Sequence, residues 1–344
     1  MRWSLQRRIH ELKAPATAAH GTTFKRDMLL LSLSDGVHTG WGEASPLSSY
    51  SGITADECDA ALRPRLELLA GADPDDPDST LRGCAEGLTG PTRAALEVAL
   101  RDLAARRAGV SLLEAMGVQM GRPVEIRALL SSNDLPVAQA EAEAARRDGF
   151  RAVKAKLATG GGSDHVRMGA LREALGPNIH LSADANGAWE VAEALIQLEL
   201  LAGTVDLVEQ PVRGLAEMRE VHGRCAVPLA LDEDATEPGA LELPPSADVV
   251  CLKLQAWGGL DKLIKAASKA RSGGLLVTYG STLDGPIGIA ASLIAAQAVE
   301  PDLACGLGTL DAFEESFDAL QIDDGEMSSP DGPGLGTDPE GTRC

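Results

Sequence analysis

The feature that most restricts the fold is an alternation of two kinds of segment from about residue 121 onward. Each short run of β-branched or aliphatic residues is followed by an Ala/Leu-rich segment with helical spacing of its apolar residues. Strands are expected near residues 124–130, 151–157, 179–184, 205–209, 227–232, 249–253, 275–279 and 304–307. No Gly-x-Gly-x-x-Gly turn follows these runs, so a closed parallel barrel is favoured over an open nucleotide-binding sheet.

Residues 1–120 lack this alternation and predict an α+β pattern. An antiparallel meander is expected from runs near residues 3–9, 28–33 and 37–41. Helices are expected near residues 54–70, 91–107 and 111–116, and an acidic, Pro-rich loop at 72–80. We therefore predict an α/β chain: a modified TIM barrel of (β/α)7β type over 121–310, and an N-terminal α+β capping domain over 1–120 that is completed by 311–344.

The charge and the cysteines restrict the partners. Lys plus Arg number 31 against 51 Asp plus Glu, and a net charge of −20 repels nucleic acid and anionic lipid. No apolar run approaches the roughly 18 residues of a membrane span, and the basic N-terminus has no apolar run behind it. The six cysteines form no CxxC pair. We expect a cytoplasmic protein with a small-molecule partner, and association into a homo-oligomer is left open.

Charged and polar residues gather where five consecutive predicted strands end. They are Lys154 and Lys156, then Asp184 with Asn186, then Glu209, then Asp232 with Glu233, and finally Lys253. The positions 156, 184, 209, 232 and 253 are 28, 25, 23 and 21 residues apart, about one βα unit each. Because reactive side chains of a parallel barrel sit at the C-terminal strand ends, these residues are predicted to form one ring.

Three carboxylates of this ring, on Asp184, Glu209 and Asp232, come from adjacent strands. Ionised carboxylates cannot share a small volume unless a cation neutralises them, so we predict a divalent metal. Oxygen ligands without a nearby His or Cys favour Mg²⁺, with Mn²⁺ as a possible substitute. The alternative is that each carboxylate only caps the helix that follows it.

Three of the chain's eight lysines belong to the ring. Lys154 and Lys156 are two apart and project to one face of a strand, while Lys253 enters from the opposite wall. A second ammonium and a metal would lower a lysine pKa from about 10.4 towards 7–8, which would let Lys156 act as a general base. The site would then remove a proton α to a carboxylate. The alternative is that the lysines are only counter-ions of the carboxylates.

With these residues in place, the chain resembles the muconate-lactonising subgroup of the enolase superfamily over nearly its whole length. The segments that carry the resemblance are GWGEASPLSSYSG (40–52), AVKAKL (152–157), SADANGAW (182–189), LVEQP (207–211), LALDED (229–234), VCLKLQAWGGL (250–260) and STLDGPIGIAASL (281–293). The resemblance implies that Asp184, Glu209 and Asp232 bind Mg²⁺ and that Lys156 and Lys253 act on opposite faces. It makes Lys154, Asn186 and Glu233 their supporting partners.

Within the subgroup, GWGEASPLSSYSG and PDLACGLGTLDAF are most similar to the o-succinylbenzoate synthase family, whose members are metal-dependent lyases of menaquinone biosynthesis. That resemblance implies that Lys156 removes an α-proton and returns it to a departing hydroxyl. Alternatives in the same superfamily are an N-acylamino acid racemase, a dipeptide epimerase or a muconate cycloisomerase. An alternative of another class is a non-catalytic binding protein that keeps the barrel.

The capping domain is expected to supply specificity through loops at residues 15–26 and 47–52 over the barrel mouth. Lys25 and Arg26 could meet a second substrate carboxylate, or could be a solvated pair at a strand start. Ser281 and Thr282 could hydrogen-bond the same group, or could cap the next helix.

Overall fold

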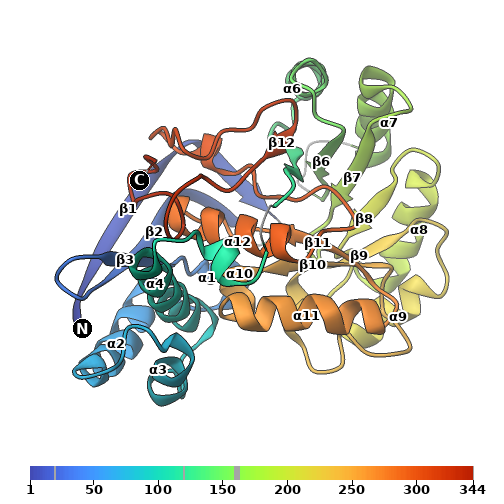
Figure 1. Ribbon diagram of the computed structural model, residues 1–344. Helices are drawn as coiled ribbons and strands as arrows, with labels where there is room; N and C mark the ends of the chain where they lie inside the picture. The colour runs from blue at the N-terminus through green and yellow to red at the C-terminus, as the bar shows by residue number, and fades with distance from the viewer. Residues whose placement is uncertain (19–20, 119–120, 159–162, 344) are drawn as a thin grey trace.

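The computed structural model describes residues 1–18, 21–118, 121–158 and 163–343. It combines a small antiparallel sheet, a bundle of helices and a curled parallel sheet surrounded by further helices (Figure 1). One hydrophobic core contains capping residues such as Met28 and Leu30 together with barrel residues such as Val153 and Leu181. The two parts therefore pack on each other through apolar side chains.

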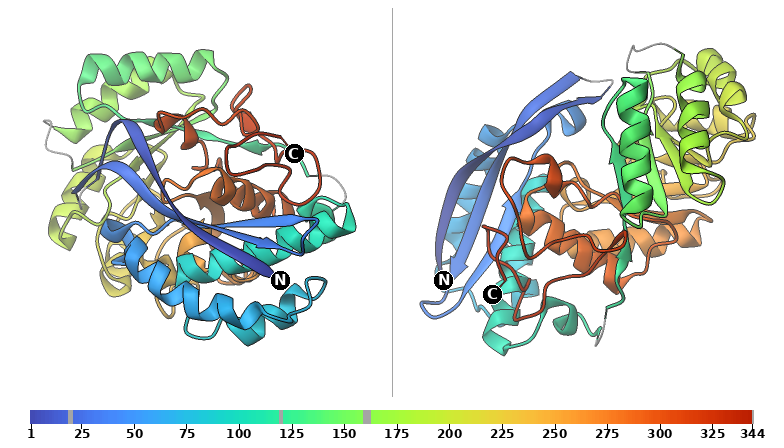
Figure 2. Two further views of the ribbon diagram at one scale, coloured as in Figure 1. Left: turned by 90° about the vertical axis from the view of Figure 1, so that its left-hand side faces the viewer. Right: turned by 90° about the horizontal axis from the view of Figure 1, so that it is seen from above.

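The capping sheet has the order β1-β2-β3 with antiparallel pairing. Its strands are β1 (Arg2–Ala18), β2 (Gly21–Ser34) and β3 (Thr39–Ala44). Figure 2 shows β1 and β2 as long strands along one flank of the molecule. The expectation of a loop at residues 15–26 is wrong for the described residues, because pairing resumes with Ala16 opposite Thr23. A register shift between Glu11 and Ala16 lets the ladder pass Pro15, which has no N–H to donate.

Helices follow this sheet along the chain. They are α1 (Ser48–Ser51), α2 (Ala55–Leu66), η1 (Glu67–Leu69), α3 (Pro77–Cys84), α4 (Gly90–Ala108) and α5 (Leu112–Ala115). Two of them, α2 and α4, pack on the sheet. Thr54 and Glu57 form the expected capping box of α2. The acidic segment is not all loop, because Asp76 accepts a hydrogen bond from Ser79 N and Pro77 begins α3.

Helix α4 lies directly on β3 because two glycines of that strand leave room for it. A Cβ on Gly40 would lie 2.4 Å from Ala99 O, and one on Gly42 would lie 1.9 Å from Ala95 O. The glycines of the GWGE segment therefore have a packing role. They hold the end of β3, and with it the start of the 47–52 segment, at a fixed height above the barrel.

The parallel sheet has seven strands in the order β11-β10-β9-β8-β7-β6-β5. They are β5 (Arg127–Leu130), β6 (Ala152–Lys156), β7 (His180–Asp184), β8 (Leu207–Glu209), β9 (Leu229–Leu231), β10 (Val249–Lys253) and β11 (Leu276–Gly280). The accompanying helices are α6 (Leu135–Arg147), α7 (Asp164–Leu175), α8 (Val191–Leu201), α9 (Leu215–His222), η2 (Glu233–Thr236), α10 (Leu254–Trp257), α11 (Leu260–Ser272) and α12 (Pro286–Ala298). None of the helices in the described ranges is long and apolar enough to cross a membrane.

The expected last strand near 304–307 is present as a connecting segment between the two edges of this sheet. Gly306 bridges to Gly280 at the end of β11, and Cys305 bridges to Ile126 beside β5. Gly306 N donates to Tyr279 O at 2.7 Å, and Arg127 N donates to Cys305 O at 2.9 Å. The barrel predicted from the alternation is confirmed in this modified form.

The C-terminal segment returns to the capping part, as its red trace shows in Figures 1 and 2. Beyond η3 (Leu310–Ala312), Glu314 N donates to Glu11 O at 3.0 Å, and Leu335 N donates to Asp102 Oδ1 at 2.7 Å. Strand β12 (Glu326–Met327) instead pairs with β4 (Val124–Glu125), which leads into the barrel.

Candidate active site

Five adjacent strands bring their charged ends together. Lys156, Asp184 and Glu209 are the last residues of β6, β7 and β8, and they are direct neighbours in the register of the sheet. Asp232 follows β9 and Lys253 ends β10. The ring expected from the spacing is therefore present at the C-terminal end of the barrel strands, where parallel strands direct their reactive groups.

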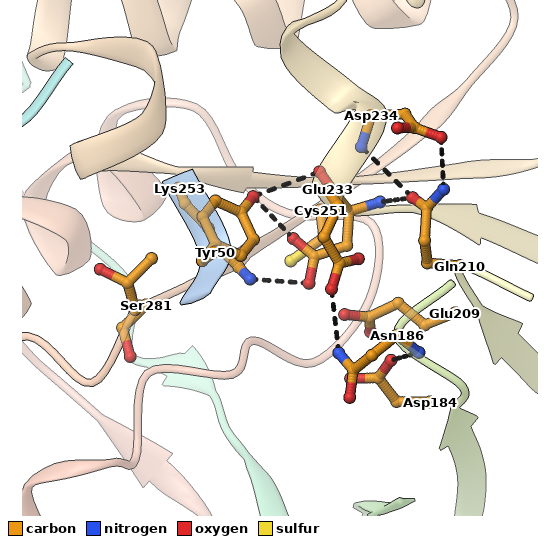
Figure 3. Close-up of polar contacts among 12 residues, drawn as sticks. Tyr50, Asp184, Asn186, Glu209, Gln210, Glu233, Asp234, Cys251, Lys253 and Ser281 are labelled. Atoms are coloured by element: carbon orange, nitrogen blue, oxygen red, sulfur yellow. Dashed lines mark hydrogen bonds and ion pairs between the residues drawn. The ribbon is translucent and has the colours of Figure 1, made fainter. Parts of the chain in front are cut away.

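On one side of the ring, Lys156 is held by polar groups of the barrel. Its Nζ lies 2.8 Å from Asp184 Oδ2 and donates to Asn186 Oδ1 at 2.7 Å. Asn186 has a positive φ of 49° and donates from its side chain to Glu233 Oε1 at 3.0 Å (Figure 3). Lys154 lies below and contacts both Asp184 and Glu209, at 2.8 and 2.9 Å. Lys156 thus has hydrogen-bonding partners that are themselves fixed.

On the other side, Lys253 is covered by the capping part. Its Nζ lies 2.6 Å from Asp232 Oδ2 and 4.2 Å from the centre of the Tyr50 ring. The Tyr50 hydroxyl donates to Asp232 Oδ1 at 3.1 Å, and Figure 3 shows the Tyr50 ring beside Lys253. The Lys253 side chain is 10% exposed, whereas that of Lys156 is 21% exposed. The two lysines therefore differ in partners and in access.

Cationic side chains of the chain itself contact the carboxylates of the ring, as in the alternative that made the lysines counter-ions, and Arg127 joins them. Four carboxylates and four cationic groups meet here: Asp184, Glu209, Asp232 and Glu233, with Arg127, Lys154, Lys156 and Lys253. Burial lowers the pKa of Lys253, but the surrounding acidic groups, Asp232 foremost with Glu233 and Glu209, together outweigh burial and the pKa is raised. The pKa of Lys154 is raised in the same way by Asp184 and Glu209.

The donors present fit a divalent cation. Glu209 Oε2 is fully buried, lies 3.3 Å from Arg127 Nη2, and accepts no hydrogen bond from any described residue. Oxygens of Glu209 and Asp232 and the Cys251 sulfur lie within 4.8 Å of one another, a separation that one cation can span. Asp184 is outside this close group and is engaged by two ammonium groups. Carboxylates of this kind suit a hard metal ion.

The expectation that no cysteine lies near the carboxylates is wrong. Cys251 is two residues before Lys253 on β10, so both side chains project to the interior face of the barrel. Arg127 Nη2 lies 3.8 Å from its sulfur. Burial raises the pKa of Cys251 to about 12, so the group is a neutral thiol at physiological pH.

Of the four residues expected near a substrate, Arg26, Ser281 and Thr282 have partners within the chain and Lys25 is exposed. Arg26 is buried and donates to the backbone oxygens of Ser45, Pro46 and Leu283, and Lys25 lies exposed on β2. Ser281 shares a hydrogen bond of 2.9 Å with Thr309, and Thr282 donates to Asp284 at 2.7 Å. Figure 3 shows Ser281 apart from the charged cluster. The side chains of Arg26, Ser281 and Thr282 connect the loops around the barrel mouth.

Sequence reasoning missed Tyr50 and Arg127. Tyr50 is one of two tyrosines in the chain and lies inside the quoted GWGEASPLSSYSG segment, so its rarity was an available signal. Arg127 is a buried arginine in the first barrel strand, and nothing in its neighbours along the chain distinguishes it from a surface residue. Its role becomes visible only when Glu209 and Cys251 are placed beside it.

Two family models match the chain. Residues 137–342 match the model described as "Enolase C-terminal domain-like", and residues 5–117 match "Mandelate racemase / muconate lactonizing enzyme, N-terminal domain". Together the matches cover most of the capping part, the barrel from α6 onward and most of the C-terminal segment.

Individual relatives have different activities in their names. The o-succinylbenzoate synthase of Mycobacterium tuberculosis is 41% identical over 50% of this chain and 53% of its own length, so the chain spans about half of that curated relative. A hydrophobic dipeptide epimerase of Roseobacter litoralis is 31% identical over 80% of this chain and 82% of its own. The L-Ala-D/L-Glu epimerase structure from Bacillus subtilis superposes with a TM-score of 0.89 at 25% identity, covering 97% of each chain.

Proposed function

The chain belongs to the mandelate racemase / muconate lactonizing enzyme family of the enolase superfamily, and from this premise we propose that it is a lyase of the o-succinylbenzoate synthase type. The reaction removes the proton α to a carboxylate of a succinyl-substituted hydroxycyclohexadiene and expels water, which leaves an aromatic ring. The 41% identity to a synthase over half of the chain supports this choice. A cytoplasmic role in menaquinone biosynthesis follows from the proposal.

The observation that carries the proposal is the difference between the two lysines. A dehydration needs one base, and the stabilising charge on the other face must stay in place. Lys253 has this character, because Asp232 and the Tyr50 ring both hold its ammonium. Lys156 is more exposed and contacts no aromatic ring among the described residues.

Each proton transfer in this scheme uses Lys156. Its neutral amine takes the α-proton, and the electron pair of the broken C–H bond moves into an enediolate. The C–O bond to the hydroxyl then breaks, and the Lys156 ammonium gives its proton to the departing oxygen, so that water leaves and the amine is restored. Lys253 supplies a fixed positive charge near the enediolate oxygens, and Asn186 aligns Lys156 Nζ.

Asp184, Glu209 and Asp232 would hold Mg²⁺, or Mn²⁺ in its place. When bound, the cation stabilises negative charge that develops on the carboxylate oxygens of the substrate.

The experiment is a dehydration assay on the purified chain with the hydroxycyclohexadiene substrate, with and without a chelator. We expect the aromatic product to form, formation to stop when the metal is removed, and Mg²⁺ to restore it. Absence of the product under all metal conditions would refute the proposal.

A second candidate is epimerisation of a dipeptide or an N-acylamino acid. It is favoured by the placement of Lys156 and Lys253 on opposite sides of the ring and by the epimerase relative that matches 80% of the chain. In deuterium oxide an epimerase would invert the α-carbon, and solvent deuterium would enter that carbon whichever enantiomer is supplied. A one-base lyase would not invert it.

A further inference from the structure

Tyr50 is where the capping part reaches the charged ring. It lies in α1 of the 47–52 segment, and that helix ends at Gly52, whose φ of 71° requires glycine-like freedom. Its hydroxyl donates to Asp232 Oδ1 at 3.1 Å, and its ring centre lies 4.2 Å from Lys253 Nζ. Asp232 Oδ2 contacts the same Nζ at 2.6 Å. Tyr50, Asp232 and Lys253 therefore form a closed set of contacts.

The base of the 47–52 segment is fixed to the strand that carries Lys253. Gln255, two residues after Lys253, accepts from Ser45 N at 3.0 Å and donates to Glu43 O at 3.2 Å. Arg26 adds donors to the backbone oxygens of Ser45 and Pro46. These bonds anchor the segment immediately before Tyr50, so the ring position is set by the fold as well as by its own contacts.

Among the described residues, no aromatic ring lies over Lys156. The cation–π contact found among these residues is the one between Tyr50 and Lys253. We propose that Tyr50 is a positioning residue that keeps Lys253 Nζ on Asp232 and away from the substrate α-carbon, and thereby restricts proton abstraction to the Lys156 face. This inference rests on the proposed function, because it concerns the same proton transfer.

The test compares Tyr50→Leu, which removes the ring, with Tyr50→Phe, which removes only the hydroxyl. Tyr279→Phe is the matched control, because Tyr279 is the other tyrosine of the chain and bonds to Val299 O in the core. The probes are the two enantiomers of an N-succinylated amino acid, incubated with each variant and Mg²⁺ in deuterium oxide. NMR measures deuterium incorporation at the α-carbon for each enantiomer.

We expect the wild type and the Tyr279→Phe variant to exchange one enantiomer strongly in preference to the other. Tyr50→Leu should raise the relative exchange of the disfavoured enantiomer about tenfold, and Tyr50→Phe should raise it about two- to threefold. A merely structural role would lower both exchange rates together and leave their ratio unchanged.

An unchanged ratio in Tyr50→Leu, or equal exchange of both enantiomers by the wild type, would overturn the inference. If Tyr50→Leu does not fold, as judged from its melting temperature, the Tyr50→Phe ratio decides, and no change there counts against the inference. The dehydration assay is a separate readout: a wild type that fails to dehydrate but exchanges one enantiomer refutes the proposed function and leaves the positioning role of Tyr50 standing.

Discussion

The Lys156 side and the Lys253 side of the ring differ in the groups that contact the lysine. Lys156 contacts only groups of the barrel, and Asn186 fixes its direction. Lys253 lies between a carboxylate and an aromatic ring that the capping part supplies. Two ammonium groups that look equivalent in the sequence thus differ in their freedom to exchange a proton with a substrate.

The difference teaches that the capping part does more than enclose a substrate. It contributes Tyr50 to one lysine only, through a segment anchored by Arg26 and Gln255. A capping part that covered both lysines equally would leave the chemistry symmetric. In the proposed reaction, the Lys156 side is the place where protons move and the Lys253 side the place where charge is held.

The largest expected effect is on turnover when Lys156 is removed. Lys156→Ala should lower kcat for dehydration by about 10⁴-fold, because general acid–base catalysis contributes up to about that factor. Calorimetric titration should show that Mg²⁺ still binds, since the three carboxylates remain. Near-normal turnover would mean that Lys156 is not the base.

Lys253→Ala should lower kcat less, by about 10²- to 10³-fold, because it removes an electrostatic contribution and no proton transfer. The ratio of the kcat loss in Lys156→Ala to that in Lys253→Ala measures how far the catalytic roles of the two lysines differ. Equal losses, together with inversion of an N-succinylated amino acid by the wild type, would identify two equivalent bases and contradict the comparison.

Glu43 belongs to the Lys253 side and connects it to the barrel. It accepts from Gly285 N at 2.8 Å and from Ser45 Oγ, and it lies near Asp284, whose Oδ2 accepts no hydrogen bond from a described residue. Burial, together with the charge of Asp284, raises the pKa of Glu43 to about 7. At pH values between the usual carboxyl pKa and about 7, Glu43 is protonated in the folded chain and ionised in the unfolded chain. The free energy of unfolding therefore falls as the pH rises through this range.

Glu43→Gln should remove this penalty and offer Asp284 a donor. At pH 8 we expect the free energy of unfolding to rise by about 2 kcal/mol relative to wild type, with little difference at pH 4.5. Denaturant unfolding at both pH values measures it. Glu114→Gln, in the exposed capping box of α5, is the control and should not stabilise the chain. A Glu43→Gln variant that is equally destabilised at both pH values would contradict this view.

The smallest expected effects on turnover are those of Asn186→Ala and Tyr50→Phe. Asn186→Ala removes the second acceptor of Lys156 Nζ and should lower kcat about tenfold, with KM little changed. The matched change on the other side, Tyr50→Phe, should affect dehydration less. A larger loss in Tyr50→Phe than in Asn186→Ala would reverse the assignment of the two sides.

The strand ends could be predicted from the sequence because topology fixes them. In a parallel barrel the C-terminal ends of the strands meet, so the positions of Asp184, Glu209 and Lys253 follow from the alternation alone. Tyr50 could not be placed in this way, because its contact depends on how a capping segment folds back over the barrel. The hairpin past Pro15 and the start of α3 at Pro77 were missed for a similar reason: pairing and capping overrode the local signal of proline.

The charges at the site show a further limit of prediction from the sequence. The carboxylates of the ring and their lysine counter-ions were visible in the sequence, but Arg127 comes from a strand with no other charged residue, so its contact with Glu209 was not foreseen. Local sequence shows which groups end a strand, and only the packed barrel shows which groups share a volume.

The most direct test of the account is a crystal structure of the Lys156→Ala variant with Mg²⁺ and the hydroxycyclohexadiene carboxylate. The account predicts that the α-hydrogen points at the space left by the Lys156 amine, within about 3.5 Å of where Nζ would lie, and that Lys253 stays against Tyr50 and Asp232. An α-hydrogen directed at Lys253, with Tyr50 moved away from it, would contradict the account.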